Sequence, residues 1–274
     1  VDLATLTDRD AAARIHADQI DVLVDLKGYT REARTGILAH CPAPVQVAWL
    51  GYPGSMGATF IDHAVVDATV VPPSARSHYS ERPMYMPGTY QPNDDEQAID
   101  AVAPTRREAG LPEKAVVFCC FCAHYKIDSA VFAAWMRILK DVPGSVLWLI
   151  DGYEAARRNL RAAASAAGVD PDRLVFAPRA KKSAHLARHR LADLFLDTFA
   201  YNAHTTMSDA LWAGLPAITC PGRTFATRVG ASLLKAAGLD ELIAAVNRDA
   251  AQARQLLQAT LPVSELDEKL GFFR

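Results

Sequence analysis

Apolar runs and helical spacings alternate along most of the chain. In the second half, runs rich in Val, Ile, Leu and Phe end in a short loop, and each is followed by a segment with apolar residues three and four apart. The expected strands cover residues 115–122, 145–150, 173–178, 193–198 and 216–220. A helix separates each strand from the next, as a parallel sheet requires. The pattern predicts an α/β fold with a Rossmann-like parallel sheet.

One of these helices, expected over 129–144, has a clear core face. Its apolar residues recur at intervals of three and four, and they are Val131, Phe132, Trp135, Met136 and Leu139. Asp128 or Ser129 is the expected N-cap, because both residue types accept hydrogen bonds from the first N–H groups of a helix. Core packing accounts for this whole segment.

The first part of the chain follows the same plan with shorter elements. A helix is expected before Ile20, and strands at 20–28 and 45–57 end in glycine-containing loops. Residues 87–112 then hold four prolines, two glycines and a cluster of acids, a composition typical of a boundary. We therefore expect residues 1–105 to be part of one Rossmann-like lobe and residues 106–274 to form a second.

Candidate chemistry lies just after the strands, where ligands bind in parallel sheets. "FAYNAHTTMSD" follows the strand at 193–198 and places His204, Thr205, Thr206 and Asp209 at a helix start. The first N–H groups of a helix have no partner within it and favour a phosphate. The alternative is an ordinary capping box, with Thr206 as N-cap and Asp209 three residues later.

Basic residues follow two other strands. Lys182, His185 and Arg188 are three apart and share one helix face, and Lys126 follows the cysteine-rich strand. The alternatives are a solvated basic face and a surface lysine. Together with the helix start at Thr205, these groups would surround one pocket with the donors and positive charge that a nucleotide diphosphate requires.

Composition excludes some function classes. The 274 residues carry a formal net charge of −2, which gives no electrostatic signal for nucleic acid or an anionic membrane. No apolar run reaches the roughly 18 residues of a membrane span, and the N-terminus has no signal-peptide pattern. We expect a cytoplasmic protein with reduced thiols, because the five cysteines are too few and too clustered for a disulfide framework.

Metal-binding patterns are weak. "DRD" at 8–10 and "DPD" at 170–172 resemble a metal-binding triplet, but neither follows a strand, and both fit helix-start or turn residues better. Cys120, Cys122 and His124 would be roughly 6.6 Å apart in succession along a strand face, too spread for one zinc ion. Buried thiols are the preferred interpretation, and no metal is expected.

Several segments carry a family resemblance. "APVQVAWLGYPGSMG", "YKID", "HLARHRLADLFLDT", "YNAHTTMSDALWAGLP" and "FATRVGASLL" resemble the catalytic region of the O-GlcNAc transferase family, which includes bacterial members and the plant SPINDLY proteins. The resemblance runs from about Ile20 to Leu242. It implies a GT-B fold and an inverting, metal-independent transfer of a sugar, usually GlcNAc, from a UDP-sugar to Ser or Thr of a protein or peptide acceptor.

The resemblance also implies residue roles. Lys126, next to Tyr125, would neutralise the diphosphate leaving group, and His185 would lie against the uracil. Further donor-site residues, by resemblance, are Lys182, Arg188, His204, Thr205, Thr206, Asp209, Gly51 and Gly54. Lys182 and Arg188 would hold the uridine side, and Asp209 the ribose end. His16 matches a histidine near the acceptor site of the family, and a half-exposed helix residue is the equal alternative.

The chain departs from the family in four respects. An upstream segment of the first lobe with another candidate base, and the tetratricopeptide repeats that recruit acceptors, have no counterpart here. Ala123 and His124 stand where the family often has a polar amide, and residues 261–274 do not resemble its C-terminal helix. Two alternatives to transfer therefore stay open: a UDP-sugar-binding or scaffold module without turnover, and an enzyme similar to UDP-GlcNAc 2-epimerase.

Overall fold

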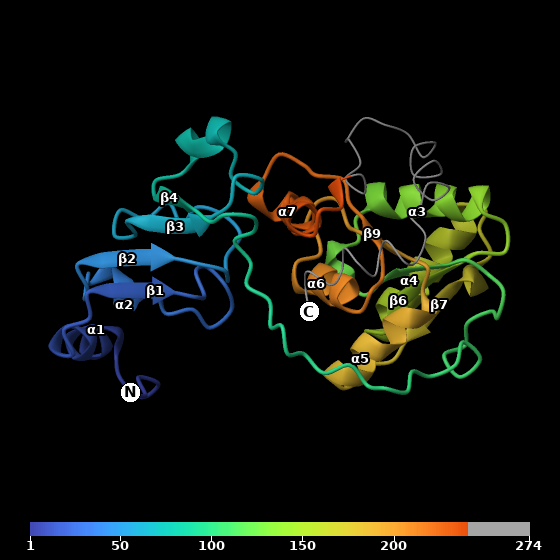
Figure 1. The fold of residues 1–274 in the computed structure, drawn as a ribbon, viewed down its shortest axis with the longest axis horizontal. Helices are drawn as coiled ribbons and strands as arrows, with labels where there is room; N and C mark the ends of the chain where they lie inside the picture. Colours follow the sequence, from blue (N-terminus) through green and yellow to red (C-terminus); the bar gives the residue numbers. More distant parts are fainter. Residues whose placement is uncertain (241–274) are drawn as a thin grey trace. The chain divides into compact units, whose positions relative to one another are not determined.

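The structure is a computed structural model that describes residues 1–240. The chain folds into two units. Unit 1 comprises residues 1–92 and 224–226, and unit 2 comprises residues 93–223 and the described residues from 227 onward. The chain passes from unit 1 to unit 2 within the proline-rich stretch 87–112. Each unit contains a parallel sheet (Figure 1). The C-terminal departure expected at 261–274 lies outside the described residues.

Unit 1 contains a four-stranded sheet of order β1-β2-β3-β4, and all its neighbouring strands are parallel. The strands are β1 (Val22–Asp25), β2 (Val45–Ala48), β3 (His63–Val66) and β4 (Arg82–Tyr85). The sequence pattern gave no strand at β4, because Pro83 interrupts it and no apolar run marks it. Proline is tolerated there because β4 is an edge strand with one unpaired side.

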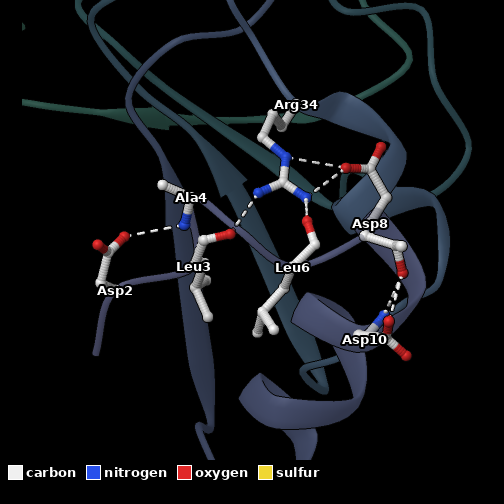
Figure 2. Close-up of polar contacts among 8 residues, drawn as sticks. Asp2, Leu3, Ala4, Leu6, Asp8, Asp10 and Arg34 are labelled. Atoms are coloured by element: carbon white, nitrogen blue, oxygen red, sulfur yellow. Dashed lines mark hydrogen bonds and ion pairs between the residues drawn. The ribbon is translucent and has the colours of Figure 1, made fainter.

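A partly buried network of hydrogen bonds fixes the start of unit 1 against its second helix. Arg34, the N-cap of α2 (Thr35–Ala39), donates to the carbonyl oxygens of Leu3 and Leu6, both at 2.7 Å, and its Nε donates to Asp8 at 2.9 Å (Figure 2). Asp8 begins helix α1 (Asp8–Ala17), and Asp10 bonds Thr7. The "DRD" segment is therefore a helix start held by local partners, as its preferred interpretation had it.

Unit 2 contains a five-stranded parallel sheet of order β7-β6-β5-β8-β9. Its strands are β5 (Val117–Cys120), β6 (Val146–Ile150), β7 (Leu174–Ala177), β8 (Leu194–Leu196) and β9 (Ala217–Ile218). The chain runs outward from β5 to β7, and then returns to the other side of β5 to form β8 and β9. The strand order therefore reverses between β5 and β8, the place where doubly wound sheets bind ligands.

Within residues 1–240, five α-helices connect or cover the strands of this sheet. They are α3 (Ser129–Asp141), α4 (Glu154–Ala166), α5 (Lys182–Arg188), α6 (Thr205–Trp212) and α7 (Val229–Ala236). Figure 1 shows α3 and α5 on opposite sides of the strands, and β5 is buried along its whole length. The predicted core face of α3 is confirmed: Val131, Phe132, Trp135, Met136 and Leu139 are all buried. Asp128 is its N-cap and accepts from the N–H of Val131 at 2.8 Å.

The first residues of unit 2 form a strap along two helices that carry candidate site residues. The indole N–H of Trp212, at the end of α6, donates to the carbonyl oxygen of Gln97 at 3.0 Å. The N–H of Asp100 donates to the carbonyl oxygen of Ser183 in α5 at 3.3 Å. Residues 93–105 therefore belong structurally with α5 and α6, although they contain little regular structure.

Candidate functional site

Lys126 lies at the switch point of the unit 2 sheet, in the loop after β5. The short helix η2 (His124–Lys126) directs its side chain to the loop after β8, where Nζ donates to the carbonyl oxygen of Asn202 at 2.8 Å. The ammonium also lies 4.0 Å from the centroid of the Tyr201 ring. Burial lowers the pKa of Lys126, an effect opposed by negative charge on nearby groups, Asp197 among them.

The ammonium of Lys126 takes part in no ion pair among residues 1–240. Its partners there are a carbonyl dipole and an aromatic face, which orient a cation without neutralising it. A half-buried charge left in this state attracts an anionic ligand. The alternative of an ordinary surface lysine does not fit this environment.

Asp197 anchors the loop after β8. Its buried carboxylate accepts from the N–H groups of Thr198 at 2.7 Å and Ala203 at 2.6 Å, and from the hydroxyl of Thr219 at 2.6 Å. Burial raises the pKa of Asp197 to about 7, although these hydrogen bonds and Lys126 oppose the shift. Helix α7 approaches closely, since a Cβ at Gly230 would lie 2.6 Å from the carboxylate. The loop that faces Lys126 is therefore held in one conformation.

The loop after β8 ends at the start of helix α6, with His204 as N-cap. The His204 side chain makes no capping hydrogen bond, and its carbonyl accepts from the N–H groups of Met207 and Ser208. Thr205 is exposed and Thr206 is half-buried. The N–H groups of Thr205 and Thr206, which precede these two, have no acceptor within the helix and carry partial positive charge. Lys126 and this helix start therefore lie on two sides of one loop and attract the same kind of ligand.

The capping-box alternative for α6 is wrong. The helix begins two residues earlier than a Thr206 N-cap requires, because its N-cap is His204. The carboxylate of Asp209 pairs instead with the ammonium of Lys182 at the start of α5. Asp209 is buried, and burial raises its pKa against the effect of Lys182, which is about half exposed. The pair joins the start of α5 to the middle of α6, so Lys182 and Asp209 are together as expected.

Arg188 lies beneath His185 at the end of α5. Its side chain is buried, donates to the carbonyl oxygen of Pro178 at 2.6 Å, and contacts Nδ1 of His185. The guanidinium also lies 4.8 Å from the ring centroid of Phe121. The three basic residues of α5 are therefore on one side of the helix, but Arg188 faces inward. It reaches the ligand side through His185, so the solvated-face alternative is wrong for this residue.

The environment of His185 keeps its imidazole neutral. Burial, and then the nearby charges of His189, Arg188 and Lys182, lower its pKa to about 3. Because Arg188 has only donors, it donates to Nδ1, and we assign the ring proton of His185 to Nε2. His189 lies behind it, with Nδ1 at 2.8 Å from the carbonyl oxygen of His185. His185 therefore presents an aromatic ring and one N–H donor.

Other expected site residues are placed differently. Tyr125 is exposed beside Lys126. Gly51, Gly54 and His16 belong to unit 1. A Cβ at Gly51 would lie 2.1 Å from the carbonyl oxygen of Leu26, so the close approach of two loops requires this glycine. His16 is exposed in the last turn of α1.

The cysteine-rich strand has a structural role. Cys119, Cys120 and Cys122 are buried, and burial raises the pKa of the Cys119 and Cys120 thiols. The strand ends at Cys120, and His124 Nε2 lies 2.7 Å from the carbonyl oxygen of Ile150. Buried thiols were the preferred interpretation, and the structure confirms it.

Tyr201, Asn202, Asp197 and Phe121 were missed by sequence reasoning. Each contacts a predicted site residue or fixes the loop that carries one. The available signal was their position, because three of the four lie between the end of β8 and the predicted helix start.

Among residues 1–240, no helix is long and apolar enough to cross a membrane.

Comparison with known proteins gives consistent matches. The chain matches glycosyl transferase family 41 over residues 1–104 and 93–260. It is 43% identical over 244 residues to a protein of Arabidopsis thaliana named "Probable UDP-N-acetylglucosamine--peptide N-acetylglucosaminyltransferase SEC", covering 87% of this chain and 25% of that protein. It is 29% identical to the UDP-N-acetylglucosamine--peptide N-acetylglucosaminyltransferase of Caenorhabditis elegans, covering 87% of this chain and 30% of that protein. The chain thus spans about a quarter of these relatives.

A solved structure extends the match to the whole fold. A mutant of the O-GlcNAc transferase of Thermobaculum terrenum superposes with a TM-score of 0.85 and 29% identity, covering all of this chain and 51% of that one. A glycosyltransferase of Rickettsia africae, 8% identical with a TM-score of 0.60, shares the fold alone. The expected fold class, an α/β fold of GT-B type, is confirmed. Together with the parallel sheets and the polar groups at the switch point, these matches show that the chain belongs to glycosyl transferase family 41.

Proposed function

We propose that unit 2 binds the UDP part of a UDP-sugar, and that the protein containing this chain transfers the sugar, GlcNAc, to Ser or Thr hydroxyls of protein acceptors. The observation that carries the proposal is Lys126, a half-buried ammonium without an ion pair among the described residues, at the switch point beside the start of α6. The names of the relatives supply the sugar and the peptide acceptor.

The chemistry of transfer fits these groups. When the sugar leaves UDP, negative charge grows on the β-phosphate. An ammonium and a helix N-terminus directed at that charge stabilise the transition state more than the ground state. Because Lys126 and the α6 start already supply this charge, we propose a reaction without a metal ion or a resident cofactor. Inversion at the sugar follows if the acceptor hydroxyl attacks directly.

The remaining contacts divide the nucleotide among the elements of unit 2. The neutral ring and the Nε2–H of His185 suit the uracil face or a carbonyl oxygen. The Lys182–Asp209 pair offers a carboxylate for ribose hydroxyls and an ammonium for oxygen acceptors. We propose that His16 acts on the acceptor side, because its imidazole is exposed and can be reached by an acceptor. A cytoplasmic location and the involvement of chain beyond these 274 residues are parts of the same proposal.

A binding module without turnover is the second candidate function. The observation that favours it is the kind of group assembled at the switch point, because a lysine and a helix start account for the binding of a diphosphate and do not by themselves require turnover. An epimerase would need acid and base carboxylates at the sugar. In the unit 2 site, the buried carboxylate of Asp197 accepts from three donors and that of Asp209 is paired with Lys182. Both carboxylates are therefore engaged with protein partners, which disfavours the epimerase.

Calorimetric titration of the chain with UDP, UDP-GlcNAc and UDP-glucose tests the proposal, with EDTA present and absent. We expect UDP to bind in both buffers, and Lys126→Ala to weaken binding by about tenfold or more, as the loss of a charge-assisted contact does. Lys114→Ala, at an exposed lysine in the loop before β5, is the matched control. Binding abolished by EDTA would refute the metal-independent proposal, and equal affinities of the two variants would remove Lys126 from the site.

Peptide transfer separates the two candidate functions. Labelled UDP-GlcNAc is incubated with the chain and a Ser/Thr-rich peptide, and mass spectrometry measures the sugar on the peptide and free in solution. Transfer or donor hydrolysis above the Lys126→Ala background supports the enzyme. Tight UDP binding with neither reaction supports the binding module for this chain.

A further inference from the structure

The aromatic ring of Tyr201 contacts two groups of the site at once. The ammonium of Lys126 lies 4.0 Å from its centroid. The imidazole of His204 stacks on it, with centroids 4.8 Å apart and an angle of 22° between the planes. Lys126 follows β5, and His204 is the N-cap of α6 after β8. One ring therefore links the two sides of the switch point.

The backbone fixes this ring from below. The carbonyl oxygen of Tyr201 accepts from the hydroxyl of Thr198 at 2.6 Å. The next residue, Asn202, is fully buried, and its side-chain amide donates to the carbonyl oxygen of Thr198 at 2.6 Å. Asp197 holds both ends of the same loop through Thr198 and Ala203. A ring on such a loop has a defined position before any ligand arrives.

A fixed aromatic face suits Lys126 better than a carboxylate would. A carboxylate in ion-pair contact would neutralise the ammonium and compete with a phosphate. An aromatic face attracts a cation through its quadrupole and leaves the N–H groups available. The other titratable groups that act on Lys126 are Asp197, Cys120 and Cys122, and His204 lies on the same ring.

We propose that Tyr201 is a positioning residue of the nucleotide site, whose ring holds the Lys126 ammonium and the His204 imidazole in register so that both meet the same diphosphate. This inference rests on the proposed function for its ligand. The ring itself, and its contact with Lys126, do not depend on it. Phenylalanine preserves the face of the ring, whereas leucine has similar bulk and no π face, so the pair of variants isolates the π interaction.

UDP titration of the wild-type chain, Tyr201→Phe and Tyr201→Leu is the first test, with thermal unfolding to verify folding. We expect Phe to bind UDP within about twofold of wild type, and Leu to bind about tenfold more weakly, the size of a desolvated cation–π contact. In a Lys126→Ala background the same Leu substitution should change the affinity by less than about threefold, because the partner is already gone. An undiminished effect in that background would overturn the proposal.

A second measurement does not require a ligand. The acetylation rate of the Lys126 amine is followed by mass spectrometry as a function of pH, with Lys114 as the internal control. Loss of the aromatic face should favour the neutral amine, so the Lys126 profile of Tyr201→Leu should shift to lower pH than those of wild type and Tyr201→Phe. Coincident profiles for the three proteins would overturn the proposal. Absence of UDP binding in the wild type, together with the shifted profile, would refute the proposed function and leave the Tyr201–Lys126 contact standing.

Discussion

Replacement of Asp197 by alanine tests whether one buried carboxylate holds the nucleotide loop. The change leaves the N–H groups of Thr198 and Ala203 without their acceptor, and both bonds are buried. Each unsatisfied buried donor costs about 1–3 kcal/mol, so the two together cost about 2–6 kcal/mol. Burial, however, raises the pKa of Asp197 from 3.8 to about 7, so the ionised form is itself disfavoured and its removal offsets part of the loss. We expect a net destabilisation of about 2–4 kcal/mol.

Urea unfolding measures this free energy, and UDP titration measures the effect on the site. Asp197→Asn should cost less, about 1–2 kcal/mol, because its amide oxygen still accepts from both N–H groups while its NH₂ faces Thr219. Asp172→Ala, at an exposed carboxylate of the short helix η3 (Pro171–Arg173), is the control, with an expected change within about 0.5 kcal/mol. A loss below about 1 kcal/mol for Asp197→Ala, with unchanged UDP affinity, would refute the anchoring role.

Two further predictions concern a glycine pair and acid stability. Gly51→Ala should destabilise unit 1 by about 1–3 kcal/mol, because the new Cβ would lie 2.1 Å from the carbonyl oxygen of Leu26. Gly54→Ala should cost less than about 1 kcal/mol, because its Cβ would meet only ring atoms of Tyr52, the nearest at 3.4 Å. Equal urea midpoints for the two variants would contradict this prediction. Burial lowers the pKa of His189 to about 4 from 6.5. Between these values the unfolded chain binds a proton that the folded chain does not, so stability falls on acidification. His189→Asn should reduce the loss between pH 7 and 4.5 by about 1–2 kcal/mol, measured by urea unfolding at both pH values.

The sequence pattern was sufficient for the elements with a strong apolar signal. The strands of unit 2 and the core face of α3 follow from runs and spacings that burial alone imposes. β4 was not predicted, because Pro83 and the mostly exposed side chains of the strand are typical of a loop, and the strand forms by pairing with β3. An edge strand of this kind is stabilised by tertiary contacts that local sequence does not encode.

The site was predictable in its charged groups and not in what holds them. Lys126 and the start of α6 could be located because the ends of parallel strands meet at one edge. The role of Asp209 depended on competition between a local cap and a distant lysine, and spacing favours the local partner. Tyr201 and Asp197 act through contacts across the loop after β8, whose conformation no short pattern specifies.

The half-buried ammonium of Lys126 implies an opposition between stability and binding. The ammonium is partly desolvated without a neutralising partner among the described residues, which lowers the free energy of unfolding of the ligand-free chain. A neutral apolar side chain of similar length would remove this destabilisation. Selection for stability alone would therefore replace this lysine. Keeping it ties the free energy of unfolding to ligand occupancy, because a diphosphate that binds only the folded chain restores what the charge costs.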